Sequence, residues 1–323
     1  MNDILTFEPF YKSVIWGGDR IATFKGLPSK GSDIGESWEL SPMPGHESVV
    51  ADGPFKGRTL PSMLAEYGKD IMGERLMKKY DGKFPLLIKF IDSSDDLSIQ
   101  VHPDDGLAMK RHNSLGKTEM WYSIMPAEGA YLYAGFKNRL DPEEFRKEVA
   151  ENTIVGSLQK YYTHPGDVFF LPAGRVHSIG RGNFVLEIQE ASDITYRIYD
   201  YDRRDAQGNP RQLHIEESVD AINFDDTEAT EAKNVKAVDG AATMVENCPY
   251  FTTELFGIGG HLHLDLSKRD SFSVLIAVKG NLTLTGAAGK KTALPQGTTV
   301  LIPASLHAVD IDGEGEVISV YIP

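Results

Sequence analysis

The sequence contains little cysteine, few basic residues and no long hydrophobic run. Cys248 is its only cysteine, which excludes an intrachain disulfide framework and a Cys-rich zinc module. A metal ion would therefore need histidine, carboxylate or amide ligands. The longest apolar runs, such as residues 274–278, fall far short of the roughly 20 residues that span a bilayer. Residues 1–13 contain no basic segment followed by an apolar one, so we expect no signal peptide and a cytoplasmic protein.

The scarcity of basic residues limits the partners of this chain. Lysine and arginine total 33 against 47 aspartates and glutamates, which gives a formal net charge of −14 over 323 residues. Nucleic-acid binding depends on neutralising phosphates, so we expect no nucleic-acid partner, and we expect no membrane partner either. A small anionic substrate is compatible with this charge, because a few local cations can form a pocket. The composition is otherwise that of a globular protein.

Short β-type segments make up most of the chain. Each is rich in branched and aromatic residues and is bounded by Gly, Pro, Asp or Ser. Many short strands at such spacing predict a mainly β protein, built as a sandwich or barrel. The predicted strands cover residues 84–91, 97–102, 120–124, 168–171, 184–189, 273–278 and 300–302.

Three segments predict helices instead. In the first, apolar side chains recur on one helical face at Leu60, Met63, Leu64 and Tyr67. Residues 141–144 (DPEE) combine an N-cap residue, a proline at the first helical position and a glutamate at the third. Residues 214–223 form the third predicted helix. Because these segments do not alternate regularly with the strands, we expect a few helices that decorate a β protein.

A polar linker and a faint repeat predict two β-barrels. Residues 224–240 are polar and small, as in a linker. Residues 166–177 (GDVFFLPAGRVH) and 297–307 (GTTVLIPASLH) share a glycine, a Pro-Ala turn and a final histidine at similar spacing. We therefore predict a larger domain over residues 1–238, with N-terminal strands and helical insertions, and a smaller, degenerate β-domain over residues 239–323.

Two polar segments suggest a site inside the larger barrel. In residues 98–103 (SIQVHP), positions two apart share one face of a strand, so Ser98, Gln100 and His102 project side by side. In residues 116–122 (GKTEMWY), Glu119 can offer a carboxylate oxygen to a metal, and Lys117 shares its face. The alternative in both cases is ordinary solvent-exposed polar surface.

Two further segments add candidates. Residues 166–177 predict a buried strand that ends in a Pro/Gly turn, after which His177 enters the next strand; the alternative is a hairpin with an incidental histidine. In residues 192–201 (SDITYRIYDY), Arg197 lies between aromatic residues on a strand and can act as a permanently charged anion clamp. The alternative there is a surface ladder with cation–π packing.

The combined set predicts a metal site. Two imidazoles, one carboxylate and one amide suit zinc with an open coordination position, although iron or manganese would fit equally well. One anionic ligand leaves the site with net positive charge, which keeps the ion a useful Lewis acid. The four candidate ligands are Gln100, His102, Glu119 and His177.

The turn in residues 166–177 resembles the second motif of the cupin barrels. As a set, FPLLIKFID, LSIQVHPDD, GKTEMWY, PAGRVHSIG and SDITYRIYDYDR resemble the type I mannose-6-phosphate isomerases of the short bacterial form. GESWELS at residues 35–41 and Trp16-Gly17-Gly18 fit this family as well. The resemblance covers residues 9–204 by motif and the C-terminal part only by architecture.

The resemblance implies two cupin-type, jelly-roll barrels and a zinc-dependent enzyme, with one zinc ion per chain. It would interconvert mannose 6-phosphate and fructose 6-phosphate through a cis-enediol, as a monomer or homodimer. The family's zinc ligands match Gln100, His102, Glu119 and His177. Its catalytic cations match Arg197 and Lys117, and its substrate- and phosphate-binding residues match Ser98, Lys89 and Lys117.

One position departs from the family pattern. Longer members carry a histidine before the active-site lysine, whereas this chain has Gly116. A histidine base at that position is therefore excluded here.

Two other functions compete with the isomerase. A cupin metal oxygenase would favour a ligand set richer in histidine, whereas the amide and the cations here suit an anion. A non-catalytic sugar-phosphate-binding cupin would bind the substrate without proton exchange. In the smaller domain, an alternative is a second metal site formed by His261, His263 and His307. No glutamate follows His263 at a matching position, so we predict a structural barrel there.

Overall fold

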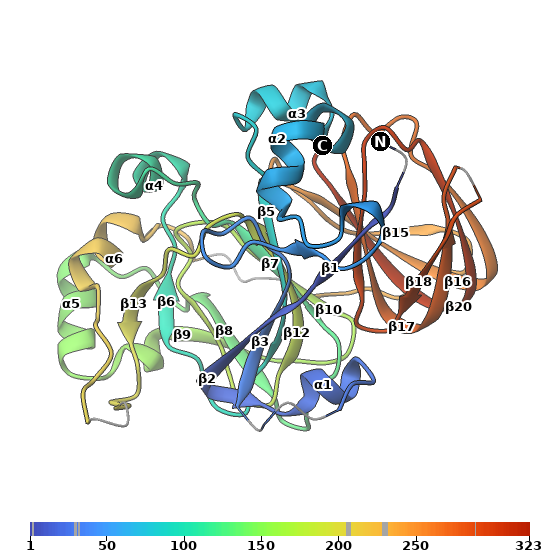
Figure 1. The fold of residues 1–323 in the computed structure, drawn as a ribbon. Coiled ribbons are helices and arrows are strands. Elements are labelled where there is room, and N and C mark those ends of the chain that lie inside the picture. Colours follow the sequence, from blue (N-terminus) through green and yellow to red (C-terminus); the bar gives the residue numbers. More distant parts are fainter. Residues whose placement is uncertain (2, 29–30, 32, 205–207, 228–231, 288) are drawn as a thin grey trace.

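Antiparallel β-sheets form most of the molecule (Figure 1). The computed structural model describes residues 1, 3–28, 31, 33–204, 208–227, 232–287 and 289–323. The described strands lie in an eight-stranded, a seven-stranded and a five-stranded sheet. The predicted mainly β fold class, with a few decorating helices, is confirmed.

The C-terminal strands form most of the eight-stranded sheet, in the order β15-β16-β20-β17-β19-β1-β4, with β18 paired to β17. These strands are β1 (Leu5–Glu8), β4 (Val49–Val50), β15 (Ala242–Asn247), β16 (Thr252–Asp265), β17 (Ser273–Thr285), β18 (Lys291–Pro295), β19 (Thr299–Ile302) and β20 (Ala308–Tyr321).

The other two sheets come from the rest of the chain. The seven-stranded sheet contains, in spatial order, β14 (Lys233–Asn234), β10 (Asp167–Leu171), β7 (Glu119–Ser123), β12 (Phe184–Glu190), β5 (Leu86–Asp92), β3 (Ile34–Leu40) and β2 (Phe10–Gly18). The five-stranded sheet contains β13 (Tyr196–Tyr199), β6 (Ile99–Val101), β11 (His177–Ile179), β8 (Tyr131–Phe136) and β9 (Leu158–Tyr162). Each of the seven predicted strands overlaps one of the observed strands.

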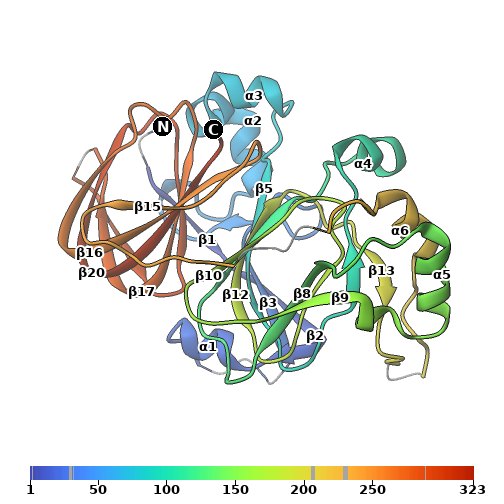
Figure 2. The same cartoon turned by 180° about the vertical axis from the view of Figure 1, so that it is seen from behind.

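The three predicted helices are confirmed. They are α2 (Leu60–Met72), α5 (Pro142–Ala150) and α6 (Ile215–Ala221). Asp141 caps α5 through the expected capping box, in which its side chain accepts hydrogen bonds from the first turn and Glu144 reaches back to the Asp141 N–H. Figure 2 shows α5 and α6 beside the five-stranded sheet.

Three short helices were not predicted: α1 (Arg20–Phe24), α3 (Glu74–Lys79) and α4 (Asp105–His112). They bury few side chains, so no apolar face repeats over several turns; α4 buries only Ala108. Two 3₁₀ turns, η1 (Gly53–Phe55) and η2 (Ile154–Ser157), complete the helical segments. Within the described parts of the chain, no helix has the length and apolar character to cross a membrane.

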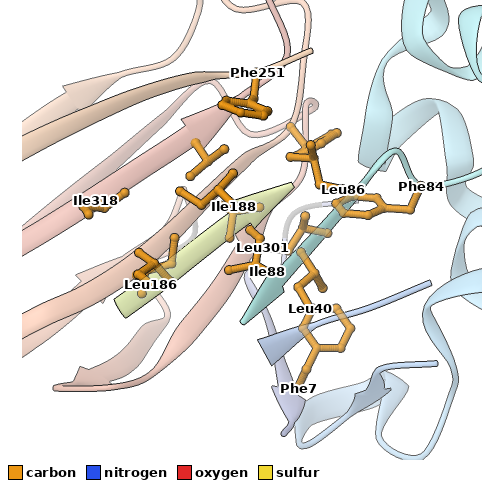
Figure 3. Close-up of a cluster of buried hydrophobic side chains, with 14 of the residues drawn as sticks. Phe7, Leu40, Phe84, Leu86, Ile88, Leu186, Ile188, Phe251, Leu301 and Ile318 are labelled. Carbon is orange, nitrogen blue, oxygen red and sulfur yellow. The ribbon is translucent and has the colours of Figure 1, made fainter. Parts of the chain in front are cut away.

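Apolar clusters between the sheets define the layers. One cluster packs Ile88 and Ile188 of the seven-stranded sheet against Leu301 and Ile318 of the eight-stranded sheet (Figure 3). A second cluster, which includes Trp121, lies between the seven- and five-stranded sheets. The alternation along β12 explains this arrangement. Phe184, Leu186 and Ile188 face the first cluster, whereas Val185, Glu187 and Gln189 face the space between the seven- and five-stranded sheets. We call that space the barrel interior.

The predicted linker is partly structured. Lys233 and Asn234 form β14 and pair with β10, whereas residues 228–231 of the linker lie outside the described residues. The N-terminal strands β1 and β4 extend the otherwise C-terminal sheet. The division into domains 1–238 and 239–323 stays a prediction.

The Pro/Gly turn after β10 connects two different sheets. It leads from β10 in the seven-stranded sheet to His177, the first residue of β11 in the five-stranded sheet. The chain therefore does not return as a hairpin. Gly174 lies in this turn with a φ of 88°, and its N–H donates to the His102 carbonyl oxygen at 2.9 Å. The turn thus ties the segment before His177 to the backbone of His102.

Substitution of Gly174 tests how tightly this turn is packed. A Cβ at Gly174 would lie 3.1 Å from the Ala221 carbonyl oxygen, whereas at Gly45, where φ is 81°, nothing lies within 4 Å. Both Gly174→Ala and Gly45→Ala should lose about 1–2 kcal/mol of unfolding free energy from the left-handed backbone. Urea denaturation should show a further loss only for Gly174→Ala. Equal losses would show that the turn accommodates a side chain without cost.

Candidate metal centre

Three side chains from two sheets meet in the barrel interior. His102 directly follows β6, Glu119 begins β7 and His177 begins β11. All three are buried, and one potential ligand atom from each lies within 4.8 Å of the others. The two imidazole Nε2 atoms are 3.2 Å apart, and Glu119 Oε1 lies 3.2 Å from His177 Nε2. Glu119 Oε2 lies 3.6 Å from His102 Nε2.

The hydrogen bonds behind the imidazoles determine which atoms face this group. His102 Nδ1–H donates to the Ile194 carbonyl oxygen at 2.8 Å, and His177 Nδ1–H donates to the Arg175 carbonyl oxygen at 2.9 Å. Both Nε2 atoms therefore present lone pairs to each other and to Glu119. Glu119 Oε1 is buried and has no hydrogen-bond partner. Facing acceptors repel one another. The Lys117 ammonium group relieves this repulsion at His102 Nε2 and Glu119 Oε2, and a bound cation would relieve it for all three side chains.

Burial keeps the imidazoles in the form that binds metals. Burial, together with the charge of the nearby Lys117, lowers the pKa of His177 to about 3. The same two causes hold the pKa of His102 well below its ordinary value. Burial also raises the pKa of Glu119 to about 7, although the nearby Lys117 opposes this shift. Both histidines are thus neutral near neutral pH, as metal ligands must be.

The structure places Gln100 and Arg197 beside the three acceptors. In the five-stranded sheet Gln100 pairs with His177 on one side and with Arg197 on the other. Directly paired residues share a sheet face, so the three side chains form one row. The Gln100 amide Nε2 lies 3.3 Å from His177 Nε2. Arg197 donates from Nη1 to the Gln212 carbonyl oxygen at 3.0 Å, while its buried Nε has no partner.

Lys117 contacts His102 and Glu119 directly, whereas Lys89 is paired with other groups. Lys117 Nζ donates to His102 Nε2 at 2.9 Å and also to Glu119 Oε2. Lys89 is 7% exposed and donates to Glu187 Oε2 and Gln189 Oε1, each at 2.9 Å. Burial alone would lower the pKa of Lys89, but the combined effect of Glu187, Glu36 and Glu119 outweighs it and raises that pKa.

The remaining predicted contact, Ser98, is buried and comes just before β6. The structure thus brings His102, Glu119, His177 and Lys117 together, with Gln100 next to His177 and Arg197 paired with Gln100 on the neighbouring strand. It places Lys89 in a separate ion pair. The roles predicted for all of these residues stay predictions.

Sequence reasoning missed two buried acids next to this site. Glu187 accepts from Trp121 Nε1 at 2.9 Å and from Lys89, and Glu36 accepts from Trp38 Nε1 at 2.6 Å. Burial opposes ionisation of Glu187, but Lys89 and then Lys117 overcome it and lower its pKa to about 2. A signal was present: β12 (FVLEIQE) is buried throughout, yet it carries three polar residues. Polar side chains on a buried strand require partners.

Gly116 leaves no room for a side chain. A Cβ there would lie 2.6 Å from the backbone nitrogen of Asp105 and 2.7 Å from the carbonyl carbon of Asp104. The start of α4 packs directly on this glycine, which accounts for the departure from the longer family members.

The C-terminal sheet encloses an apolar cluster and carries its histidines elsewhere. His261 and His263 are exposed on β16, where they bond to Asp312 and Asp310 at 2.8 and 2.7 Å. His307 is exposed just before β20. Among the described residues, His102, Glu119 and His177 form the one group of three or more such side chains close enough to hold a metal.

The sheets and the buried His/Glu/His group define a cupin-type protein with a candidate metal site. Residues 4–123 match the family model for the catalytic domain of type I phosphomannose isomerase, and residues 241–322 match that for the cupin domain of mannose-6-phosphate isomerase. The chain belongs to the type I phosphomannose isomerase family.

The similarity to known proteins extends over nearly the whole chain. The mannose-6-phosphate isomerase of Streptococcus mutans is 33% identical over 94% of both chains, and mannose-6-phosphate isomerase ManA of Bacillus subtilis is 34% identical over 97% of both. The crystal structure of a mannose 6-phosphate isomerase from Bacillus subtilis has a TM-score of 0.87 at 30% identity and covers 99% of each chain. A putative mannosephosphate isomerase from Archaeoglobus fulgidus has a TM-score of 0.82 at 25% identity, covering 100% of this chain and 98% of its own.

Removal of Lys89 tests the buried ion pair. Lys89→Met leaves the Glu187 carboxylate buried without its cation, which should cost about 3–5 kcal/mol of unfolding free energy at neutral pH. Without Lys89, burial raises the pKa of Glu187. The loss should therefore shrink as the pH falls and the carboxyl group takes up a proton. Urea denaturation at two pH values measures both effects.

The matched control is Lys279→Met. Lys279 forms a cross-strand ion pair with Glu316 at 3.0 Å, but its side chain is 69% exposed. Loss of such a surface pair should cost no more than about 1 kcal/mol. Similar losses of unfolding free energy in Lys89→Met and Lys279→Met would contradict the claim that Lys89 neutralises a buried carboxylate.

Proposed function

We propose that this protein interconverts mannose 6-phosphate and fructose 6-phosphate with a divalent metal ion, zinc, bound by His102, Glu119 and His177. The observation that carries the proposal is the set of facing acceptor atoms in the barrel interior, bordered by Lys117 and Arg197. Family membership supports the reaction, and the facing lone pairs support the metal.

The donor atoms fit a zinc ion. Two neutral imidazole nitrogens and one carboxylate are common zinc ligands, and the Gln100 amide lies next to His177 as a fourth candidate. When bound, such an ion would supply a Lewis acid that polarises the sugar carbonyl and hydroxyl oxygens. Lys117 currently donates to His102 Nε2, so metal binding to that nitrogen would release the ammonium group.

The cations beside the acceptors suit the isomerisation. Moving a proton between C2 and C1 of the sugar develops negative charge on the oxygens of both carbons. Arg197, with its unpaired buried Nε, and Lys117 would stabilise that charge as preorganised donors. Because both side chains are already held within the barrel, they need little reorganisation during the reaction.

We further propose that Ser98, Lys89 and Lys117 bind the phosphate. Lys89 already contacts Glu187 and Gln189, so it would have to exchange one of these partners for a phosphate oxygen. Such remote binding would hold the reacting carbons at a fixed place relative to the metal ligands. A cytoplasmic location and a monomeric or homodimeric state stay predictions.

An isomerase assay tests the proposed function. The purified protein should convert mannose 6-phosphate to fructose 6-phosphate in a coupled assay, and deuterium from heavy water should appear in the product. Prolonged dialysis against a chelator should abolish turnover, and zinc should restore it under nitrogen. Binding without turnover would favour the sugar-phosphate-binding cupin, and a requirement for oxygen would favour the oxygenase.

Substitutions separate metal binding from catalysis. His177→Ala should lose the metal and turnover together, because one of three ligands is gone. Arg197→Gln should keep the metal but lower kcat about 100-fold, as loss of a charge-stabilising donor does. Metal content by mass spectrometry and steady-state kinetics measure both variants. His263→Ala, which removes an exposed histidine from β16, is the control and should change neither. Normal turnover in Arg197→Gln would remove Arg197 from the mechanism.

A further inference from the structure

The segment that carries Lys117 is held on both sides by carboxyl groups. Gly116 N–H donates to Asp105 Oδ1, and Thr118 N–H donates to Glu190 Oε2, each at 2.8 Å. Between them, Lys117 N–H donates to the Pro103 carbonyl oxygen at 3.1 Å. Three consecutive backbone N–H groups are thus fixed from three directions, which restricts where the Lys117 side chain begins.

Glu190 is the more deeply buried of the two acids. It ends β12, is 3% exposed, and its own N–H donates to the Thr118 carbonyl oxygen at 3.1 Å. Glu190 therefore bonds to both backbone groups of Thr118. Asp105, at the start of α4, is near enough for its charge to favour the protonated form of the Glu190 carboxyl group.

We propose that Glu190, together with Asp105, is a positioning residue that holds the Gly116–Thr118 backbone and thereby keeps Lys117 against His102 and Glu119. The proposal rests on the proposed function for the role of Lys117. Glu190 itself contacts neither the facing acceptors nor the Lys117 ammonium group. It acts through the backbone on either side of that lysine.

The surroundings of Glu190 make its carboxyl proton sensitive to moderately alkaline pH. Burial, with a contribution from Asp105, raises the pKa of Glu190 to about 8 despite its bond from Thr118. Burial also raises the pKa values of Tyr80 and Tyr250, which face Glu190, to about 12, so both phenols stay protonated there. Cys248 is partly buried and its thiol pKa is raised. Asp104, the remaining acid nearby, accepts from Leu107 N–H as the cap of α4.

Loss of the Glu190 proton has a defined sign. Below the pKa of Glu190 its carboxyl group is neutral. Above that pKa Glu190 is negatively charged, and repulsion from Asp105 moves the two side chains apart. Gly116 and Thr118 are then pulled in different directions, so Lys117 loses its position. Turnover should fall as the pH rises through about 8.

Kinetics of Glu190 variants test this role. In Glu190→Ala, kcat for mannose 6-phosphate should fall on the order of 10- to 100-fold with an unchanged metal content, because a displaced catalytic group slows the chemical step. In Glu190→Gln the neutral amide oxygen can still accept the bond from Thr118 N–H, so kcat at neutral pH should be restored to within about twofold. The alkaline fall near pH 8 should disappear in this variant and in Asp105→Asn.

The control for lost stability is Asp141→Ala. It removes the capping box of α5, at a cost of about 1 kcal/mol, far from Lys117. It should keep the kcat and pH profile of the wild type. The proposal is overturned by normal kcat in Glu190→Ala, by an unchanged alkaline fall in Glu190→Gln, or by losses of kcat that follow the melting temperature in all variants. If Glu190→Ala does not fold, the pH dependence of kcat in Glu190→Gln and Asp105→Asn still tests the proposal.

Hydrogen exchange separates this proposal from the proposed function. In Glu190→Ala the amides of residues 116–118 should exchange at least about tenfold faster, because a lost bond lowers their opening free energy. In Asp141→Ala they should not change. If the wild type has no isomerase activity, the proposed function fails. The exchange measurement still tests whether Glu190 holds the backbone of residues 116–118. If the wild type is active and the exchange is unaltered, the positioning role alone fails.

Discussion

The arrangement depends on one electrostatic constraint: acceptor atoms of three buried side chains face one another, and Lys117 donates to two of these side chains, His102 and Glu119. The carbonyl oxygens of Ile194 and Arg175 accept hydrogen bonds from the Nδ1–H groups of the two imidazoles. Both Nε2 lone pairs therefore point inward beside Glu119. Such a group is costly in a protein interior unless a cation joins it. The turn at Gly174 and the pairing of β6 with β11 serve to bring these atoms together.

The charges around this group are balanced pair by pair. Lys117 is paired with Glu119, and Lys89 with Glu187, inside a chain whose net charge is −14. Arg197, which pairs with Gln100 on the neighbouring strand, has a buried Nε without a hydrogen-bond partner. A sugar phosphate would meet these local cations at short range, because salt screens the overall negative charge beyond about 8 Å. The net charge of the protein and the anionic nature of the proposed substrate are therefore compatible.

Much of this site could be predicted from the sequence because strand periodicity is local. The alternation of side chains along a strand predicted that Gln100 lies beside His102 and Lys117 beside Glu119. The capping-box sequence predicted α5. Other features depend on contacts between distant segments. The pairing of β1 with β19, the passage from β10 to β11 between two sheets, and the engagement of Lys89 by Glu187 involve partners that no local pattern identifies. The short helix α4 lacks an apolar face, so its packing against Gly116 gave no sequence signal.

Anomalous X-ray diffraction at the zinc absorption edge tests the central claim most directly. Crystals of the active protein should show one strong peak within about 2.0–2.3 Å of His102 Nε2, His177 Nε2 and a Glu119 carboxylate oxygen. Fully active crystals with no metal peak among these three side chains would contradict the account.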